Sequence, residues 1–334
     1  KPVIPGGTAT FTTITGTSGL ATGTQLQTSG DNKTCLYTPT TTTCDSDNVV
    51  TITGEGTFSL NPATGVVTYA ADANATAGTK ASITYRVTDV VGQTDTCVLT
   101  PVIAPPPVAT NDTSTGNWDT NQAIAVLAND TPGAASAPLV PATVKLCGSG
   151  QTPNGCNVTT LVVPNEGTYT VQTDGNVVFD PLPAFTGTAT AVRYQVADSL
   201  GQITTATITP TVRVAPNAVD DVSSANYDTN QVINPLTNDV NGTGTIDPTT
   251  VKLCGTGQTS PSCTQTTLTV SGVGTYTVDA TTGVVTFDPL PTFTGTAPAV
   301  TYQVSDSFGQ TDNATITPTV GPPPLPVAVN DALT

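Results

Sequence analysis

Seven cysteines are the residues of this chain best suited to form covalent cross-links. Six of them form three pairs with eight residues between the members, namely Cys35 and Cys44, Cys147 and Cys156, and Cys254 and Cys263. Each pair lacks a nearby histidine and a Cys-x-x-Cys motif, which favours disulfides over thiolate metal sites, and reduced buried cysteines are the other alternative. A disulfide closing a ten-residue loop stabilises a fold by roughly 2.5–3 kcal/mol and persists in an oxidising, extracellular setting.

Aspartates form the second group with binding chemistry. Asp112, Asp221, Asp331, Asp130 and Asp239 each directly follow an Asn or another Asp. Oxygen-rich turns of this kind near domain junctions can bind calcium. Their spacing matches no calcium loop that we can defend, and Asp and Asn also form turns through hydrogen bonds to their own backbone. We therefore expect no cofactor and interpret these residues as turn formers, with calcium as the alternative.

Catalytic residues are poorly represented. The absence of histidine excludes histidine-dependent triads, general bases and metal ligands. Asp89, Asp198 and Asp306 recur before a Gly-Gln pair. An acid repeated in every copy indicates a structural turn rather than the paired carboxylates of a glycosidase. We predict that the chain is not an enzyme.

The charge of the chain restricts its partners. The chain has 24 Asp and Glu residues against 8 Lys and Arg residues, which gives a formal net charge of −16. Such a field repels phosphate backbones and anionic lipids, so no nucleic acid partner is expected. No apolar run approaches the length of a membrane span, and Lys1 starts neither a signal nor a transit peptide, so we expect a mature chain that does not insert into membranes.

The sequence repeats itself with a period of about 108 residues. Val-Lys-Leu-Cys-Gly begins at Val144 and again at Val251, and Phe-Asp-Pro-Leu-Pro begins at Phe179 and again at Phe287. Proline-rich linkers separate the copies and favour extended, semi-rigid spacers, so the repeats should lie in a row. The predicted domains are a diverged β-sandwich repeat at 1–104, two further repeats at 105–214 and 215–320, and a proline-rich linker with a first strand or donor strand at 321–334.

Short segments rich in Val, Ile, Thr and Tyr alternate apolar with polar residues between Gly, Pro, Asn and Asp clusters, which predicts strands and turns. One hairpin is expected from 275–278 and 283–287, and another from 302–304 and 315–317. About seven strands per hundred residues is typical of an immunoglobulin-like sandwich. The predicted fold class is all-β, with tandem immunoglobulin-like β-sandwich repeats arranged as an elongated string.

Two single residues are interpreted through the repeat alignment. Cys97 stands where the later copies have Ala206 and Ala314, and its alternation with Leu99 points it inward. We therefore predict a buried free thiol rather than an intermolecular cross-link. Trp118 has a tyrosine at the equivalent position of the next copy, so we interpret it as a packing residue rather than a platform for sugar.

The longest shared phrases, at 251–259, 274–279, 283–291 and 301–310, resemble the CshA-type fibril repeat family. The resemblance covers 107–320 closely and the first hundred residues loosely. It implies a place in long bacterial surface proteins, in which tandem repeats form a fibrillar stalk and a separate region usually adheres. Neither an adhesive head nor a cell-wall sorting signal is recognisable, so the resemblance implies the stalk.

The last residues copy the opening of a repeat. Pro326, Val327, Ala328, Val329, Asn330 and Asp331 match 107–112 and 216–221, whereas the first copy has no recognisable counterpart. One hypothesis is that this segment supplies an edge strand to another subunit and so builds a head-to-tail filament. The alternatives are a longer covalent string beyond Thr334 and an edge strand that the first copy makes from its own residues 8–15.

These observations together predict a non-enzymatic, extracellular protein of the cell surface. Its expected role is a repeat segment or subunit of a bacterial surface fibril or filament, with copies of itself or neighbouring repeats as partners. The alternative is an adhesin module that binds a protein or glycan on a host or partner cell, centred on the diverged residues 1–100.

Overall fold

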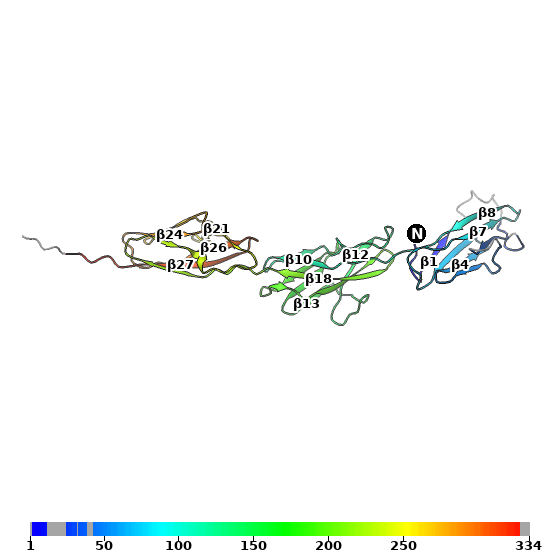
Figure 1. The fold of residues 1–334 in the computed structure, drawn as a ribbon, viewed down its shortest axis with the longest axis horizontal. Coiled ribbons are helices and arrows are strands. Elements are labelled where there is room, and N and C mark those ends of the chain that lie inside the picture. The colour runs from blue at the N-terminus through cyan, green and yellow to red at the C-terminus, as the bar shows by residue number, and fades with distance from the viewer. Residues whose placement is uncertain (1, 12–24, 32, 39–42, 328–334) are drawn as a thin grey trace, which may run out of the picture.

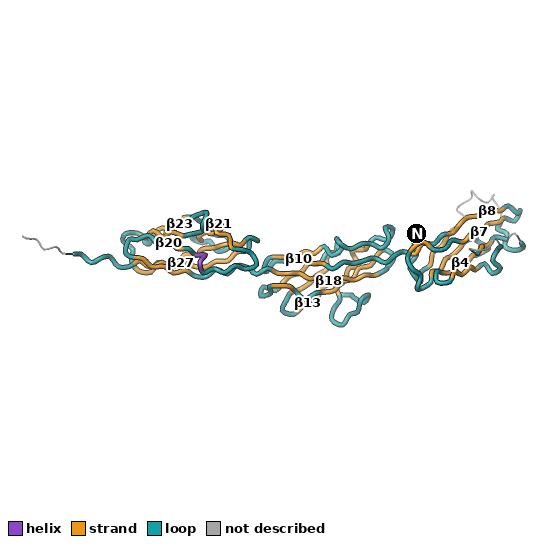
Figure 2. The backbone as a smooth tube through the Cα atoms, in the orientation of Figure 1, coloured by secondary structure: helices purple, strands orange, loops and turns teal. Residues whose placement is uncertain are grey.

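The computed structural model describes residues 2–11, 25–31, 33–38 and 43–327. They form three β-sandwiches that follow one another in a row, so the molecule is elongated (Figure 1). We refer to them as repeat 1 (residues 2–104), repeat 2 (105–214) and repeat 3 (215–320). Strands and loops account for almost the whole described chain, and the single helical turn within it is η1 (Pro235–Thr237) in repeat 3 (Figure 2).

Repeat 2 has two facing sheets, with the strand orders β10-β18-β17-β12 and β11-β15-β14-β13. The first strand, β10, runs parallel to the last strand, β18, and the short strand β16 pairs with the far end of β18. Its strands are β10 (Asp112–Gly116), β11 (Gln122–Ile124), β12 (Leu139–Leu146), β13 (Thr160–Val163), β14 (Gly167–Val171), β15 (Val177–Pro181), β16 (Gly187–Thr188), β17 (Val192–Asp198) and β18 (Ile203–Val212).

Repeat 3 has the same topology, with the orders β19-β27-β26-β21 and β20-β24-β23-β22, and β19 again runs parallel to the last strand. Both hairpins predicted from the sequence of this repeat, β23–β24 and β26–β27, are confirmed. Its strands are β19 (Asp221–Ala225), β20 (Gln231–Ile233), β21 (Ile246–Leu253), β22 (Thr267–Val270), β23 (Gly274–Val278), β24 (Val285–Pro289), β25 (Gly295–Thr296), β26 (Val300–Asp306) and β27 (Thr311–Val320).

Repeat 1 is a reduced version of this sandwich, with the sheets β1-β5-β4-β3 and β2-β7-β8 and the separate pair β6-β9. A parallel bridge between Val3 and Ile103 stands where β10 and β19 form five-residue ladders in the other repeats. Its strands are β1 (Thr8–Phe11), β2 (Cys35–Tyr37), β3 (Val49–Ile52), β4 (Gly56–Asn61), β5 (Val66–Ala71), β6 (Gly78–Thr79), β7 (Ile83–Thr88), β8 (Thr94–Leu99) and β9 (Val102–Ile103).

Each sandwich buries its own core because alternate strand residues face the opposite sheet. In β17, for example, every second residue from Val192 to Asp198 is buried. Each core contains a cross-strand aromatic pair with ring centroids 4.6–4.7 Å apart, namely Phe58 and Tyr69, Tyr169 and Phe179, and Tyr276 and Phe287. Burial of each such ring contributes roughly 1.5–3 kcal/mol. The all-β, tandem immunoglobulin-like fold expected from the sequence is therefore the fold of this chain.

Candidate functional sites at the repeat edges and junctions

A disulfide closes one surface loop in each repeat. It joins Cys35 to Cys44, Cys147 to Cys156 and Cys254 to Cys263, with Cα–Cα distances of 5.5, 4.2 and 4.4 Å. In repeats 2 and 3 the far end of the loop is also held by a central strand, because the backbone N–H groups of Cys156 and Cys263 donate to Gln195 and Gln303 at 3.0 Å.

Cys97 is a free cysteine, as predicted, but the prediction that it is buried was wrong, because the residue is exposed. Cys97 lies opposite Tyr85 in the β7–β8 pair, just as Ala206 lies opposite Tyr194, so the two positions are equivalent. Ala206 is covered by the segment that leads into β10, where Ala109 N–H donates to Thr204 Oγ1 at 3.1 Å. No described segment runs along the same side of β8, and Thr94–Val98 are all exposed.

We expect one thiol per native chain to react with Ellman's reagent without denaturant. Burial of part of the side chain and the charge of Asp95 raise the pKa of Cys97, so the reaction should be slower at pH 7 than that of a free cysteine. Absorbance at 412 nm of the wild type and of Cys97→Ser measures this. A thiol that reacts only after unfolding would restore the original prediction.

A buried glutamine links the two sheets of repeat 2, and another links those of repeat 3. Gln122 on β11 accepts from Ser114 Oγ of β10 at 2.6 Å and donates to the Thr211 carbonyl of β18 at 3.0 Å, so it links both sheets. Gln231 makes the same two contacts with Ser223 and Thr319 at 2.5 and 3.0 Å. The sequence contained a signal for this role, because Gln122 and Gln231 end the repeated Asp-Thr-Asn-Gln phrase.

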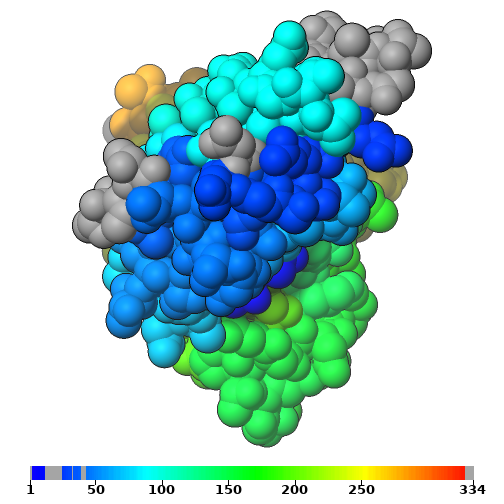
Figure 3. All heavy atoms as spheres, turned by 90° about the vertical axis from the view of Figure 1, so that its right-hand side faces the viewer, coloured from blue at the N-terminus to red at the C-terminus, as the bar shows by residue number. Residues whose placement is uncertain are grey.

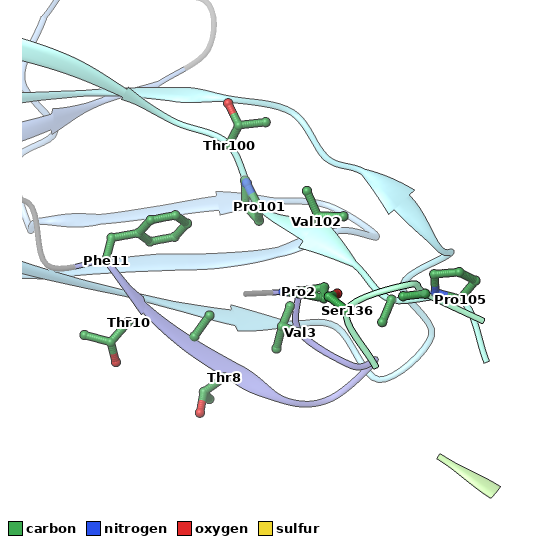
Figure 4. A pocket seen from close by; sticks show the side chains of 13 residues that line it. Pro2, Val3, Thr8, Thr10, Phe11, Thr100, Pro101, Val102, Pro105 and Ser136 are labelled. Atoms are coloured by element: carbon green, nitrogen blue, oxygen red, sulfur yellow. The ribbon is translucent and has the colours of Figure 1, made fainter. Parts of the chain in front are cut away.

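A pocket of about 620 Å³ lies beside the equivalent position of repeat 1, and Pro105, Ala134 and Ser136 of repeat 2 line part of it. Ala9 lies opposite Tyr69 as Gln122 lies opposite Phe179, so a methyl group replaces the bridging side chain. The pocket separates β1 from the segment 100–102, and Figure 4 shows the Phe11 side chain reaching from β1 toward Pro101. None of the lining residues is charged.

The outer side of β8 is an open sheet edge in the described part of repeat 1. The equivalent edge of repeat 2 carries β10, with Asp112 opposite Ile208. There the N–H of Thr207 donates to Asn111 Oδ1 at 3.0 Å, and in repeat 3 Thr315 N–H donates to Asp220 Oδ1 at 2.8 Å. Unpaired edges of this kind accept added strands.

The predicted assembly strand is only partly described. Pro326 and Val327 are exposed and follow repeat 3 as an extended tail, whereas Ala328, Val329, Asn330 and Asp331 lie outside the described residues. Of the predicted alternative at residues 8–15, residues 12–15 lie outside the described residues, and β1 forms an edge strand that pairs with β5 in the sheet opposite β8.

Specific side-chain and backbone contacts connect repeats 2 and 3. The Arg213 guanidinium lies 4.1 Å from the centre of the Phe308 ring and donates to Asn117 Oδ1 at 2.9 Å. Trp118 N–H donates to Gln310 Oε1 at 2.7 Å, and Asn117 Nδ2 donates to the Phe308 carbonyl at 3.1 Å. The Trp118 side chain is 45% exposed, and its indole N–H donates to the Pro183 carbonyl of the same repeat at 2.7 Å, so Trp118 contacts repeat 3 through its backbone N–H and its predicted packing role stays a prediction.

Glycines let each linker pass close to the following repeat. A Cβ at Gly133 would lie 2.0 Å from the Pro105 carbonyl oxygen, and one at Gly242 would lie 2.2 Å from the Val214 carbonyl oxygen. The end view in Figure 3 shows repeat 1 (blue and cyan) in front of repeat 2 (green). Extended proline-rich linkers packed in this way act as spacers with little freedom.

The aspartates that the sequence assigned to turns fall into two groups. Asp89, Asp198 and Asp306 form the predicted turns, since the Oδ1 atom of each accepts two backbone N–H groups, at 2.8–3.0 Å. The other group forms buried pairs. Asp112 meets Asp130 in repeat 2 and Asp221 meets Asp239 in repeat 3, whereas Asp331 lies outside the described residues.

A tyrosine hydroxyl contacts both carboxyls of each pair. Tyr194 donates to the carboxylate of Asp130 at 2.9–3.0 Å, and Asp130 Oδ1 also accepts the Thr110 N–H at 2.8 Å. Asp112 is 7% exposed, and its Oδ2 has no hydrogen-bond partner among the described residues. Burial and, to a smaller extent, the nearby Asp130 charge together raise the pKa of Asp112 to about 6, although hydrogen bonds from Tyr194 and Asn129 lower it.

Repeat 3 contains a similar arrangement, in which Asp239 is half-buried and Oδ2 of Asp221 and Oδ2 of Asp239 both lack a hydrogen-bond partner among the described residues. Tyr302 donates to Asp239 at 2.8 Å, and burial together with the Asp239 charge raises the pKa of Asp221 to about 6. Two carboxylates per site are few for a calcium ion, which takes six to eight oxygen ligands. No group of three or more Asp, Glu, His or Cys side chains suited to a metal occurs among the described residues.

The described part of the chain contains no helix with the length and apolar character that a membrane-spanning helix needs.

Comparison with known sequences gives one family. Its description is the surface adhesin CshA repetitive domain, and it matches residues 104–212 and again residues 213–320. The search of curated proteins gives no match.

Solved structures of tandem domains resemble the chain weakly. The titin I-band fragment I67–I69 is 11% identical with a TM-score of 0.29, over 96% of this chain and 94% of that chain. Sidekick-1 immunoglobulin domains 1–5 are 14% identical with a TM-score of 0.34, over 96% and 57%. The human desmocollin-1 ectodomain is 13% identical with a TM-score of 0.23, over 79% and 51%. At these values the three structures carry no conclusion about function.

Proposed function

The chain belongs to the surface adhesin CshA repetitive-domain family, and from this membership we propose that it is a structural stalk segment of an extracellular bacterial surface fibril. The observation that carries the proposal is the junction between repeats 2 and 3, where Arg213, Asn117 and Trp118 of one repeat bind Phe308 and Gln310 of the next. A fibril that extends away from the cell surface needs stiff junctions between its domains, and this junction combines a cation–π contact with hydrogen bonds of defined direction.

The finer proposal concerns assembly. A second copy of the chain adds its segment 326–331 to the open edge of β8, which makes a head-to-tail contact that repeats without closing. In the register of the other repeats, Asp331 lies opposite Leu99, and Asn330 accepts the Val98 N–H as Asn111 accepts that of Thr207. Residues that precede Lys1 in a longer chain would occupy the same edge, which is the competing proposal.

Negative-stain electron microscopy of four samples tests both the stalk proposal and the assembly proposal. The full chain is expected to form filaments, whereas a chain lacking 326–334 should give single three-domain rods because it has no donor strand. Val98→Pro should also give single rods. This substitution removes the backbone N–H of residue 98. In repeat 2 the equivalent N–H, that of Thr207, points outward and bonds the segment that adds to the edge, so its loss should prevent strand addition. An edge strand itself tolerates proline at such a position.

An equal mixture of the two defective chains provides the fourth sample. The truncated chain keeps an intact β8 edge and Val98→Pro keeps its tail, so the mixture should give rods of double length and no filaments. Single rods from every sample would reject strand donation and leave the stalk proposal standing. Compact or sharply bent particles from the full chain would contradict the stalk proposal itself.

An adhesive module that binds a glycan or protein is the competing function. The pocket between β1 of repeat 1 and the start of repeat 2 is the described feature that favours it, although its lining offers one aromatic ring, Phe11, and no charge. Saturable binding of a glycan or matrix protein by this chain, lost on Ala9→Gln, would favour the adhesive function over the stalk.

A further inference from the structure

The two buried carboxyl pairs lie where the chain enters repeats 2 and 3. Asp112 begins β10, and Asp130 holds the segment just before it through the Thr110 N–H. The bridge between Val108 and Thr131 lies beside this contact and directly follows the linker. The site therefore fastens both the first edge strand and the end of the linker to the body of the repeat.

The charges around each site are all of one sign. In repeat 2 the groups that face the pair are Tyr194 from β17, Asn129 from the loop before Asp130, and the two carboxyls themselves. In repeat 3 the charges of Asp220 and Asp312 add to the repulsion. Among the described residues no Lys or Arg side chain contributes to either site.

The hydrogen bonds distinguish the two acids of a pair. Burial raises the pKa of Asp130 too, but Asp130 accepts from a hydroxyl and a backbone N–H, and both bonds favour its carboxylate form. Asp112 has a buried oxygen, Oδ2, without a partner, next to that negative charge. A second full charge in this place would be uncompensated, because like charges in one buried site cannot both ionise without a large cost.

We propose that repeats 2 and 3 each contain a proton-binding site, in which one proton carried by Asp112 or Asp221 neutralises the buried pair and fastens β10 or β19 to its sheet. Loss of this proton leaves two carboxylates at the start of the strand and loosens the strand and the linker end together. In the stalk proposed above, the first strands and linker ends of repeats 2 and 3 are therefore held most firmly at acidic pH.

The direction of the pH dependence follows from the pKa of about 6 for Asp112 and Asp221, above the ordinary value of 3.8. The folded chain binds more protons than the unfolded chain between these values, so its stability falls as the pH rises through this window. The contribution is complete below pH 3.8 and is lost as the pH passes about 6.

Carbon-13 NMR of the full chain, labelled at the aspartate carboxyls, tests the proposal. Two carboxyl resonances should titrate with midpoints near pH 6, and both should vanish in Asp112→Asn/Asp221→Asn. Because asparagine imitates the neutral acid, this variant should melt several degrees higher than the wild type at pH 7.5 and at the same temperature at pH 4. The matched control, Asp180→Asn/Asp288→Asn at exposed equivalent positions, should follow the wild type at both pH values.

Two results would overturn the proposal. One is that every aspartate carboxyl titrates below pH 4.5. The other is that millimolar calcium at pH 7.5 raises the melting temperature of the wild type and not that of Asp112→Asn/Asp221→Asn, which would make the site a cation site. Asp130→Ala gives a further contrast, because it removes both oxygens that accept from Tyr194 and Thr110 and should destabilise repeat 2 at both pH values.

Discussion

Replacement of Cys147 and Cys156 together by serine is expected to lower the free energy of unfolding of repeat 2 by roughly 2.5–3 kcal/mol. The disulfide closes a loop whose ends lie 4.2 Å apart at Cα, and the unfolded chain gains this loop entropy when the bond is absent. The disulfide also holds Cys156 in the position from which its backbone N–H donates to Gln195 Oε1 on the central strand β17.

The measurement uses the fluorescence of the single tryptophan of the chain, Trp118, in urea. Its backbone N–H contacts repeat 3, but its indole N–H donates to the Pro183 carbonyl of repeat 2, so the fluorescence reports the unfolding of repeat 2. Cys97→Ser serves as the background for all samples, so that no free thiol can exchange with the disulfides. Serine at Cys254 and Cys263 is the matched control, because it should leave the Trp118 transition nearly unchanged. A loss below about 0.5 kcal/mol in the repeat 2 variant would mean that the loop is held mainly by its hydrogen bonds.

Replacement of Gln122 by alanine is expected to destabilise repeat 2 by roughly 2–3 kcal/mol. The change removes two partly buried hydrogen bonds, leaves the Thr211 carbonyl without its partner, and leaves unfilled the space that the buried Gln122 side chain occupies. The same urea titration followed by Trp118 fluorescence measures it.

Gln172→Ala is the matched control for this variant, since Gln172 is exposed in the same repeat and should change the free energy by less than about 0.5 kcal/mol. Equal effects of the two substitutions would show that the bridge between the sheets contributes nothing beyond an ordinary surface glutamine. The double variant Gln122→Ala/Ser114→Ala should cost little more than Gln122→Ala alone, because the two side chains form one contact.

The sequence predicted the features that depend on local pattern. Alternation of Val, Thr and Tyr placed the hairpins β23–β24 and β26–β27, since side chains in a strand alternate between the two faces. The repeated phrases identified the family before any geometry was known, because several long phrases in a fixed order are specific.

Features that depend on contacts between distant segments were not predictable in this way. Asp112 and Asp130 both carry turn-forming side chains, and only the fold brings them to the same tyrosine on β17. Arg213 and Phe308 are far apart in sequence and belong to different repeats. The error at Cys97 has the same origin, since alternation gives the direction of a side chain and a neighbouring segment decides whether it is covered.

The parallel pairing of the first and last strands has a mechanical consequence. Tension along the string pulls β10 toward the entry of repeat 2 and β18 toward its exit, so the two strands are loaded in shear. The evenly spaced bonds of the ladder from Asp112 and Ile208 to Gly116 and Val212 must then break together rather than one after another. Repeats 2 and 3 resist stretching through this geometry, whereas repeat 1, with its bridge at Val3 and Ile103, yields at lower force unless a strand occupies the edge of β8.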